Sequence, residues 1–232
     1  KLVPIRTGNR NSFELGRIDT DLMYDVAMNW YWGNSGSDDI YHDVQTRSQG
    51  LSFRSNLARL MEELIAENKI DKARDIIDLA MTHLPVEHFE FYTFVEPFVD
   101  GYYKVGDTEK ARELYYQLKG IYVDRIDYYA GIPLDEQYER AEEILSDLEA
   151  YKRLNNILID NNDRELAEKE TLIFNEQIDR IAFMNRDNLL DQLPPADPGE
   201  MADPDLIDTM PVSDTTMEDN VRTEVPADSI SN

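Results

Sequence analysis

Apolar and small residues recur at helical spacing in two neighbouring stretches of the chain, residues 54–85 and 92–118. The two stretches have the same internal order. Ala73 in the first and Ala111 in the second stand where two antiparallel helices would come closest. The shared positions are Leu57, Leu60, Leu64, Ala73, Ile77, Ala80 and Pro85 in the first stretch, and Val95, Phe98, Tyr102, Gly106, Ala111, Tyr115 and Leu118 in the second.

This spacing is typical of the tetratricopeptide repeat, a helix–turn–helix unit of about 34 residues. Asn68 and Gly106 fall where the two turns are expected. Hairpins of this kind stack on one another and bind other molecules, and they seldom carry catalytic groups. We therefore predict an all-α fold in which residues 54–190 form a tetratricopeptide-like stack that acts as an interaction module.

The segments on either side of the two hairpins predict further helices. Residues 1–53 are expected to form an N-terminal extension that packs on the repeats, with a helix capped by Thr20 and running to Trp30. Beyond Gly120 the repeat weakens. One long helix over residues 134–159 and a last helix ending near Asn188 then predict a third, divergent hairpin that caps the stack.

Residues 191–232 differ in composition from the rest of the chain. They contain no aromatic residue, six of the ten prolines, eleven acidic residues and a single base, Arg222. Such a segment buries too little apolar surface to offset the entropy lost on ordering. We predict an acidic, flexible tail.

The charge of the chain limits its partners. The formal net charge is -25 and the sequence pI is about 4.3, which argues against nucleic acid or an anionic membrane surface as a partner. The chain has no cysteine, and no apolar run in it approaches the length of a membrane span. Because it begins at Lys1, we expect a fragment or processed form, whose upstream residues would hold any targeting signal.

Several N-terminal motifs carry a family resemblance. They are Leu2-Val3-Pro4-Ile5, the block Gly16-Arg17-Ile18-Asp19-Thr20-Asp21-Leu22-Met23-Tyr24-Asp25, then Trp32-Gly33-Asn34, Asp39-Ile40-Tyr41 and residues 54–64. Together they resemble the C-terminal soluble part of a bacterial family of multi-pass membrane proteins of unknown function. That family is related to the protein O-mannosyltransferases of the GT-C glycosyltransferase superfamily. The resemblance covers roughly residues 1–130.

The resemblance implies a location and a role. The sugar-transfer site of such a protein would lie in membrane-embedded N-terminal spans that this chain lacks, so no catalytic residue is carried over. The chain would be a non-catalytic scaffold domain at the periplasmic face of the inner membrane, attached only through those missing spans, and would recruit an acceptor or partner protein. The alternative is a free-standing tetratricopeptide adaptor unrelated to glycosylation, which could be cytoplasmic.

Acidic and histidine residues in the N-terminal third invite a metal or acid–base interpretation. Asp21 and Asp25 are one helical turn apart, and Asp38 and Asp39 precede His42. Helix capping and solvated faces explain the first group better, and a surface loop explains the second, because neither has the order of ligands of a calcium loop. Nucleophile and phosphate-binding motifs are also missing. We expect no catalytic residue, cofactor or metal in this chain.

Aromatic residues gather in two segments. Trp30, Tyr31 and Trp32 form the first, and the second lies in residues 89–94. A hydrophobic seal between the N-terminal helix and the first repeats is the favoured interpretation, because aromatic side chains dominate core burial, and a ligand-binding wall is the alternative. The members of the second segment are Phe89, Phe91, Tyr92 and Phe94.

In tetratricopeptide stacks the first helix of each hairpin lines the concave face. That geometry predicts a groove for a protein or peptide partner, and its carboxylates favour a basic or polar one. The predicted groove residues are Ser55, Ala58, Glu62, Ile65, Thr93, Glu96, Asp100 and Tyr103.

Three triplets in the tail resemble the short acceptor motif of bacterial protein O-glycosylation. They are Asp208-Thr209-Met210, Asp214-Thr215-Thr216 and Asp228-Ser229-Ile230. They make Thr209, Thr215 and Ser229 candidate sites of modification, although a segment rich in Asp, Ser and Thr also produces such triplets by chance.

Overall fold

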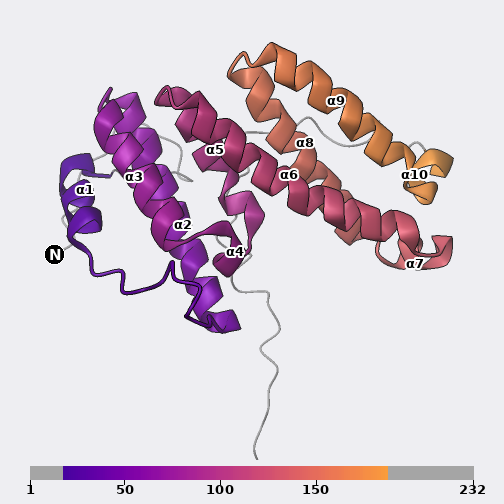
Figure 1. The fold of residues 1–232 in the computed structure, drawn as a ribbon, viewed down its shortest axis with the longest axis horizontal. Coiled ribbons are helices and arrows are strands. Elements are labelled where there is room, and N and C mark those ends of the chain that lie inside the picture. The colour runs from indigo at the N-terminus through magenta and orange to yellow at the C-terminus, as the bar shows by residue number, and fades with distance from the viewer. Residues whose placement is uncertain (1–17, 188–232) are drawn as a thin grey trace, which may run out of the picture. The chain divides into compact units, whose positions relative to one another are not determined.

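The computed structural model describes residues 18–187, and every regular element in that range is helical, which confirms the all-α prediction (Figure 1). The predicted flexible tail and the candidate sites Thr209, Thr215 and Ser229 lie outside the described residues. The helices are α1 (Thr20–Asn29), α2 (Val44–Ala66), α3 (Ile70–His83), α4 (Val86–Phe89), a 3-10 turn (Tyr92–Phe94), α5 (Glu96–Lys104), α6 (Thr108–Gly131), α7 (Leu134–Glu139), α8 (Ala141–Asp160), α9 (Arg164–Asp179) and α10 (Ala182–Asp187).

Three tight turns join the long helices into hairpins, α2 with α3, α5 with α6 and α8 with α9 (Figure 1). Each turn contains one residue at positive φ, namely Asn68 (60°), Gly106 (83°) and Asn162 (59°). Glycine and asparagine tolerate this left-handed backbone, which ends a helix and lets the chain reverse. In each turn the residue that follows the positive-φ residue donates its backbone N–H to the carbonyl five residues earlier. These bonds run from Lys69 to Leu64 (2.8 Å), from Asp107 to Tyr102 (2.8 Å) and from Asp163 to Leu158 (2.9 Å).

Small residues stand at the predicted helix contacts. Ala73 in α3 and Ala111 in α6 are fully buried, and Ala167 in α9 is nearly so. The apolar core continues from one hairpin to the next, because α3 packs beside α5, and α6 packs beside α8. The third hairpin is therefore part of the same core as the first two.

The starts of α1 and α2 differ from the prediction. Asp43 accepts a hydrogen bond from the N–H of Thr46 (2.7 Å), so α2 begins at Val44 and the expected boundary between residues 53 and 54 falls inside a helix. At α1 the cap is Asp19, which accepts from the N–H of Leu22 (3.1 Å), and Thr20 is the first helical residue. In both cases the aspartate carboxylate satisfies an otherwise unpaired helix N–H.

The second and third hairpins show a similar shift. Helix α6 continues through Gly120 to Gly131, since burial of Tyr122, Ile126 and Tyr129 outweighs the cost of about 1 kcal/mol for a helical glycine. The predicted helix over residues 134–159 is broken at Arg140 into α7 and α8, and the last helix is divided into α9 and α10.

Candidate functional site

Three predicted groove residues on α5 form hydrogen bonds with the third hairpin. Glu96 is only 3% exposed, and Asp100 and Tyr103 are half-buried. All three bond to residues in or next to α8 and α9. Arg153 Nε donates to Glu96 (3.3 Å), Asn161 Nδ2 donates to Asp100 (2.8 Å), and the Tyr103 hydroxyl donates to Asp163 (2.7 Å). Glu96 is therefore buried in the core and does not line an open groove, whereas the groove role of Asp100 and Tyr103 stays a prediction.

The other groove candidates remain open to solvent to different degrees. Glu62 is exposed on α2, Ser55, Ile65 and Thr93 are half-buried, and Ala58 is buried in the core. None of the contacts within the described residues tests whether Glu62, Ile65 and Thr93 meet a partner. Their role as groove residues stays a prediction.

Burial gives Glu96 unusual electrostatics. Desolvation raises the pKa of its carboxyl to about 7, against the opposing effect of Arg153, whose positive charge favours the ionised form. The Tyr122 hydroxyl also donates to Glu96 (3.3 Å). Since Glu96 lies between α5, α6 and α8, it is a titratable group inside the core rather than a surface acid.

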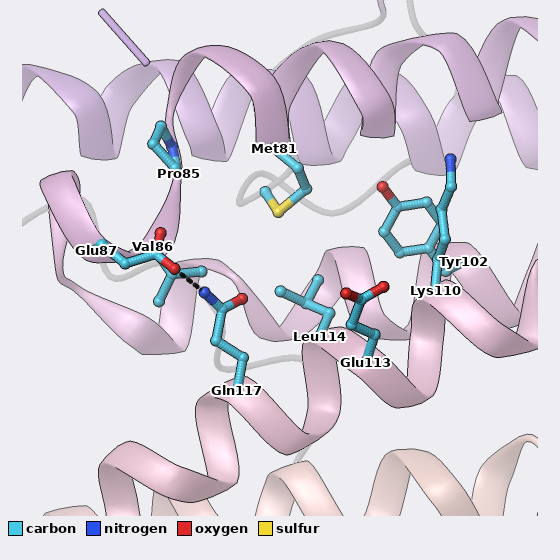
Figure 2. Close-up of a pocket in the computed structure, with 9 residues that line it drawn as sticks. All are labelled: Met81, Pro85, Val86, Glu87, Tyr102, Lys110, Glu113, Leu114 and Gln117. Atoms are coloured by element: carbon cyan, nitrogen blue, oxygen red, sulfur yellow. Dashed lines mark hydrogen bonds between the residues drawn. The ribbon is translucent and has the colours of Figure 1, made fainter. Parts of the chain in front are cut away.

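A shallow groove of about 460 Å³ lies between the α3–α4 segment and the α5–α6 hairpin (Figure 2). Met81, Val86 and Leu114 give it an apolar floor, and Glu113 and Lys110 stand at its side. Polar groups at its rim are already paired within the chain. Lys110 Nζ lies 2.7 Å from Asp78 Oδ1, and the side-chain amide of Gln117 donates to the Glu87 carboxylate. The complete lining is Met81, Pro85, Val86, Glu87, Tyr102, Lys110, Glu113, Leu114 and Gln117.

This groove could not be predicted from the sequence, because its two walls come from different hairpins. Its floor residues read as ordinary core positions in the helical pattern. Only the packing of α6 beside the α3–α4 segment leaves space between them.

The acidic residues of α1 have structural partners on one side. Asp19 caps the helix, and Asp21 lies 2.8 Å from Lys69 Nζ and 2.7 Å from Lys72 Nζ. These two lysines lower the pKa of Asp21 to about 2 by hydrogen bonding to its carboxylate. Asp25, one turn further along, is exposed and has no ion pair among the described residues.

The loop candidates have partners within the described chain. Asp38 Oδ1 lies 3.1 Å from His88 Nε2, and His42 Nε2 lies 2.9 Å from the carbonyl of Ser35. Within the described range, no set of three or more histidine, aspartate or glutamate side chains is arranged to hold a metal ion. The expectation that the chain needs no metal stays a prediction.

The predicted aromatic seal forms only in part: Trp32 is half-buried and packs on the core, whereas Trp30 and Tyr31 stay exposed. The Trp30 ring contacts that of Phe53 on α2 (6.2 Å between centroids), and Trp32 stacks on His83 at the end of α3 (5.5 Å). Trp32 also contacts Phe53 (5.6 Å). Trp30 is still 53% exposed, and Tyr31 is 90% exposed. Phe89, in the second aromatic segment, instead packs in the core beside His42.

Helix α1 has two unlike sides. Thr20, Tyr24 and Ala27 face the first hairpin, with the Thr20 hydroxyl donating to Glu67 and the Tyr24 hydroxyl to Asp75 (both 2.6 Å). The exposed stripe, which we name the α1 outer face, runs along the helix and ends at Trp30, which follows the last helical residue. It consists of Leu22, Asp25, Val26, Asn29 and Trp30.

Exposed apolar side chains are concentrated in the N-terminal part of the described chain, which includes this face. Of the fourteen large apolar side chains that are exposed in the described range, nine belong to residues 22–53. The nine are Leu22, Val26, Met28, Trp30, Tyr31, Ile40, Tyr41, Val44 and Phe53. The exposure of Trp30 and Tyr31 was not predicted, because both were expected to lie in a buried seal.

None of the helices in residues 18–187 combines the length and the apolar character that a membrane crossing requires. Comparison of the chain with models of known protein families, with curated proteins and with solved structures finds no match.

Proposed function

We propose that this chain is a non-catalytic protein-interaction domain that docks its partner on the α1 outer face. The observation that carries the proposal is the exposure of Leu22, Val26 and Trp30 in one stripe, extended by the ring contact of Trp30 with Phe53. Helical hairpins supply a rigid base for this stripe, because α1 packs on both α2 and α3.

The physical argument concerns the cost of leaving such side chains in water. Fully burying one large apolar side chain is worth roughly 1.5–3 kcal/mol. A contiguous exposed patch of them marks an interaction site more often than scattered residues do. Tryptophan and tyrosine are also the side chains that most often dominate the binding energy of an interface.

The N-terminal resemblance extends this proposal to a cellular setting. The domain would belong to a membrane-bound protein O-mannosyltransferase-like glycosyltransferase and would recruit an acceptor or partner protein at the periplasmic face. A free-standing adaptor would use the same surface, so the docking proposal does not depend on the setting. Mass spectrometry of the protein from its native host separates the two: peptides from long apolar spans upstream of Lys1 support the membrane setting, and a native N-terminus at Lys1 contradicts it.

Site-specific photo-cross-linking tests the docking surface. A photoreactive phenylalanine analogue replaces Tyr31 in one variant and Tyr128, a tyrosine on α6 that is 54% exposed, in a matched control. We expect the Tyr31 position to cross-link one protein reproducibly in the native host and the Tyr128 position not to do so. The same adducts at both positions would contradict the proposal.

A second pair of variants tests the energetic contribution of the face. Leu22→Ser and Leu172→Ser remove similarly exposed leucines, 64% and 66% exposed, from α1 and α9. Only Leu22→Ser is expected to reduce the yield of the Tyr31 cross-link. Equal yields from the two variants would show that the stripe does not contribute to docking.

A further inference from the structure

We propose that the α1 outer face, together with Tyr31, binds a cationic polypeptide segment of the partner. This inference rests on the proposed function and adds the chemistry of the partner to it. Two observations support it. Residues 18–46 carry acidic side chains but no basic ones, and no cation of the described chain lies over the rings of Trp30 and Tyr31.

Residues 18–46 contain six aspartates and not one lysine or arginine. Four of the six have partners in the described part of the chain: Asp19 and Asp43 cap helices, Asp21 is paired with two lysines, and Asp38 lies 3.1 Å from His88. Asp25 has no such role and stands within the apolar stripe between Leu22 and Trp30. A partner residue opposite Asp25 is therefore favoured if it carries a positive charge.

The aromatic rings point to the same chemistry. Elsewhere in the described chain, cations lie over aromatic faces, with Lys72 Nζ 4.7 Å from the ring centre of Tyr24 and Arg125 Cζ 5.2 Å from that of Tyr92. No lysine or arginine of the described residues lies over Trp30 or Tyr31. Tryptophan is the aromatic side chain that attracts a cation most strongly, so an incoming lysine or arginine has an open ring to bind.

The dimensions of the face fit a short segment. Leu22 and Trp30 are eight residues apart on a helix, which corresponds to about 12 Å along its axis. About five residues of extended chain span this length, and three of their side chains point to the same side because successive side chains alternate. Such a segment places an apolar side chain on Leu22 and Val26, one cation at Asp25 and a second over Trp30.

Tryptophan fluorescence provides a direct test, because Trp30 and Trp32 are the two tryptophans of the chain and both lie in the cluster at the end of α1. The full chain is titrated with a synthetic peptide that has two arginines flanking leucines, and with matched peptides in which glutamine or glutamate replaces the arginines. We expect the arginine peptide to shift the emission and to bind about tenfold more tightly than the glutamine peptide, with the glutamate peptide weakest. Raising the salt from about 50 to about 500 mM should weaken only the arginine peptide.

Variants of the full chain locate the site. Asp25→Asn is expected to weaken binding of the arginine peptide about fivefold, whereas Asp160→Asn, an exposed aspartate at the end of α8, should leave it unchanged. Equal effects of the two would overturn the assignment of this face. Equal binding of the arginine and glutamine peptides would overturn the cationic chemistry while leaving the Tyr31 cross-link, and so the proposed function, intact.

Two other occupants are distinguished in the same assay. Replacing Arg6, Arg10 and Arg17 by serine should not change the affinity for the arginine peptide, and a rise of about tenfold would show that the chain's own N-terminal segment is the ligand. Phosphatidylcholine vesicles, alone or with phosphatidylserine, should leave the tryptophan emission unchanged. A shift with either kind of vesicle would identify a membrane surface as the occupant and overturn the proposal.

Discussion

Arg54 is a buried cation that organises the connection after α3. Its Nη2 donates to the backbone carbonyls of Leu84 (2.8 Å) and Pro85 (2.9 Å), and its Nε donates to the same carbonyl of Leu84 (3.2 Å). Its Nη1 donates to the backbone carbonyl of Glu90. Burial lowers the pKa of the guanidinium to about 10, so it stays protonated at neutral pH. The positive charge is balanced by carbonyl dipoles at a helix C-terminus rather than by a carboxylate.

Replacing this side chain tests its role. Arg54→Leu leaves three carbonyls without their donor, and we expect the free energy of unfolding to fall by about 3–5 kcal/mol. Arg164→Leu, at an exposed arginine, is the control and should change it by less than about 0.5 kcal/mol. Urea denaturation followed by circular dichroism measures both, and similar values for the two variants would rule out the proposed role of Arg54.

Glu96 makes stability depend on pH. Because its folded pKa, about 7, lies above its ordinary value of 4.5, the folded state holds its proton more tightly than the unfolded state does. The contribution of this group is therefore fully present below about pH 4.5 and is lost as the pH rises through about 7.

The comparison with Glu96→Gln isolates this effect from the other carboxylates. Between about pH 5 and pH 8 the wild type should lose of the order of 1–3 kcal/mol of stability relative to the variant. Denaturation midpoints measured at several pH values for both proteins give this difference. A difference that does not change with pH would mean that Glu96 is not titrating in this range.

At the scale of elements, adding a side chain is expected to have opposite effects on stability at two helical glycines, Gly101 and Gly120. A Cβ on Gly101 of α5 would come within 2.2 Å of Met61 Sδ and 3.1 Å of Ile77 Cδ1, whereas a Cβ on Gly120 of α6 would meet nothing within 4 Å. Alanine favours a helix over glycine by about 1 kcal/mol at either position. The absence of a side chain is therefore needed only at Gly101, where α5 approaches the first hairpin.

We expect Gly101→Ala to lower the free energy of unfolding by about 1–3 kcal/mol through overpacking, and Gly120→Ala to raise it by about 0.5–1 kcal/mol. Thermal unfolding of the two variants under one set of conditions gives the comparison. Stabilisation by both substitutions would contradict the close approach of α5 to Met61.

The alanines at the hairpin contacts lead to a related prediction. Ala73 and Ala111 are fully buried, so Ala73→Leu and Ala111→Leu should each cost about 1–3 kcal/mol through overpacking. Glu62→Ala, at an exposed position of α2, should leave stability nearly unchanged. A thermal melt in which Glu62→Ala is the most destabilising of the three would contradict the packing of both hairpins.

At the scale of the whole molecule, polar contacts attach the third hairpin to the second. Lys119 of α6 is paired with the buried Glu170 of α9, and Arg112 Nε lies 2.7 Å from Asp163, which also accepts from Tyr103. Breaking a buried pair by removing one partner is strongly destabilising. These contacts therefore help to hold the third hairpin on the second.

The whole chain should be inert as a glycosyltransferase. The sequence has no nucleophile or phosphate-binding motif, and the proposed function needs none. Incubation of the purified chain with lipid-linked or nucleotide-activated sugars and an acceptor peptide, followed by mass spectrometry, should show no sugar transfer. Product that increases with the amount of purified chain would contradict the proposal of a non-catalytic domain.

The sequence by itself determined the local features of this fold. Asn68 and Gly106 marked two turns because a left-handed backbone conformation depends on the residue that adopts it. Ala73 and Ala111 marked two helix contacts because only a small side chain fits there. Helical periodicity then gave the all-α class, since it depends on residues within a few turns of one another.

Only the tertiary structure decided which helix faces were buried and which stayed exposed. Glu96 belongs to a stripe on α5 that could have lined a groove, but it is buried and Arg153 of α8 supplies its partner. Trp30 could have sealed the core, but α1 turns Thr20 and Ala27 toward the first hairpin and leaves Trp30 at the surface. Periodicity shows that a stripe exists, but its neighbours are set by how helices distant in sequence pack, because burial is a property of the assembled core.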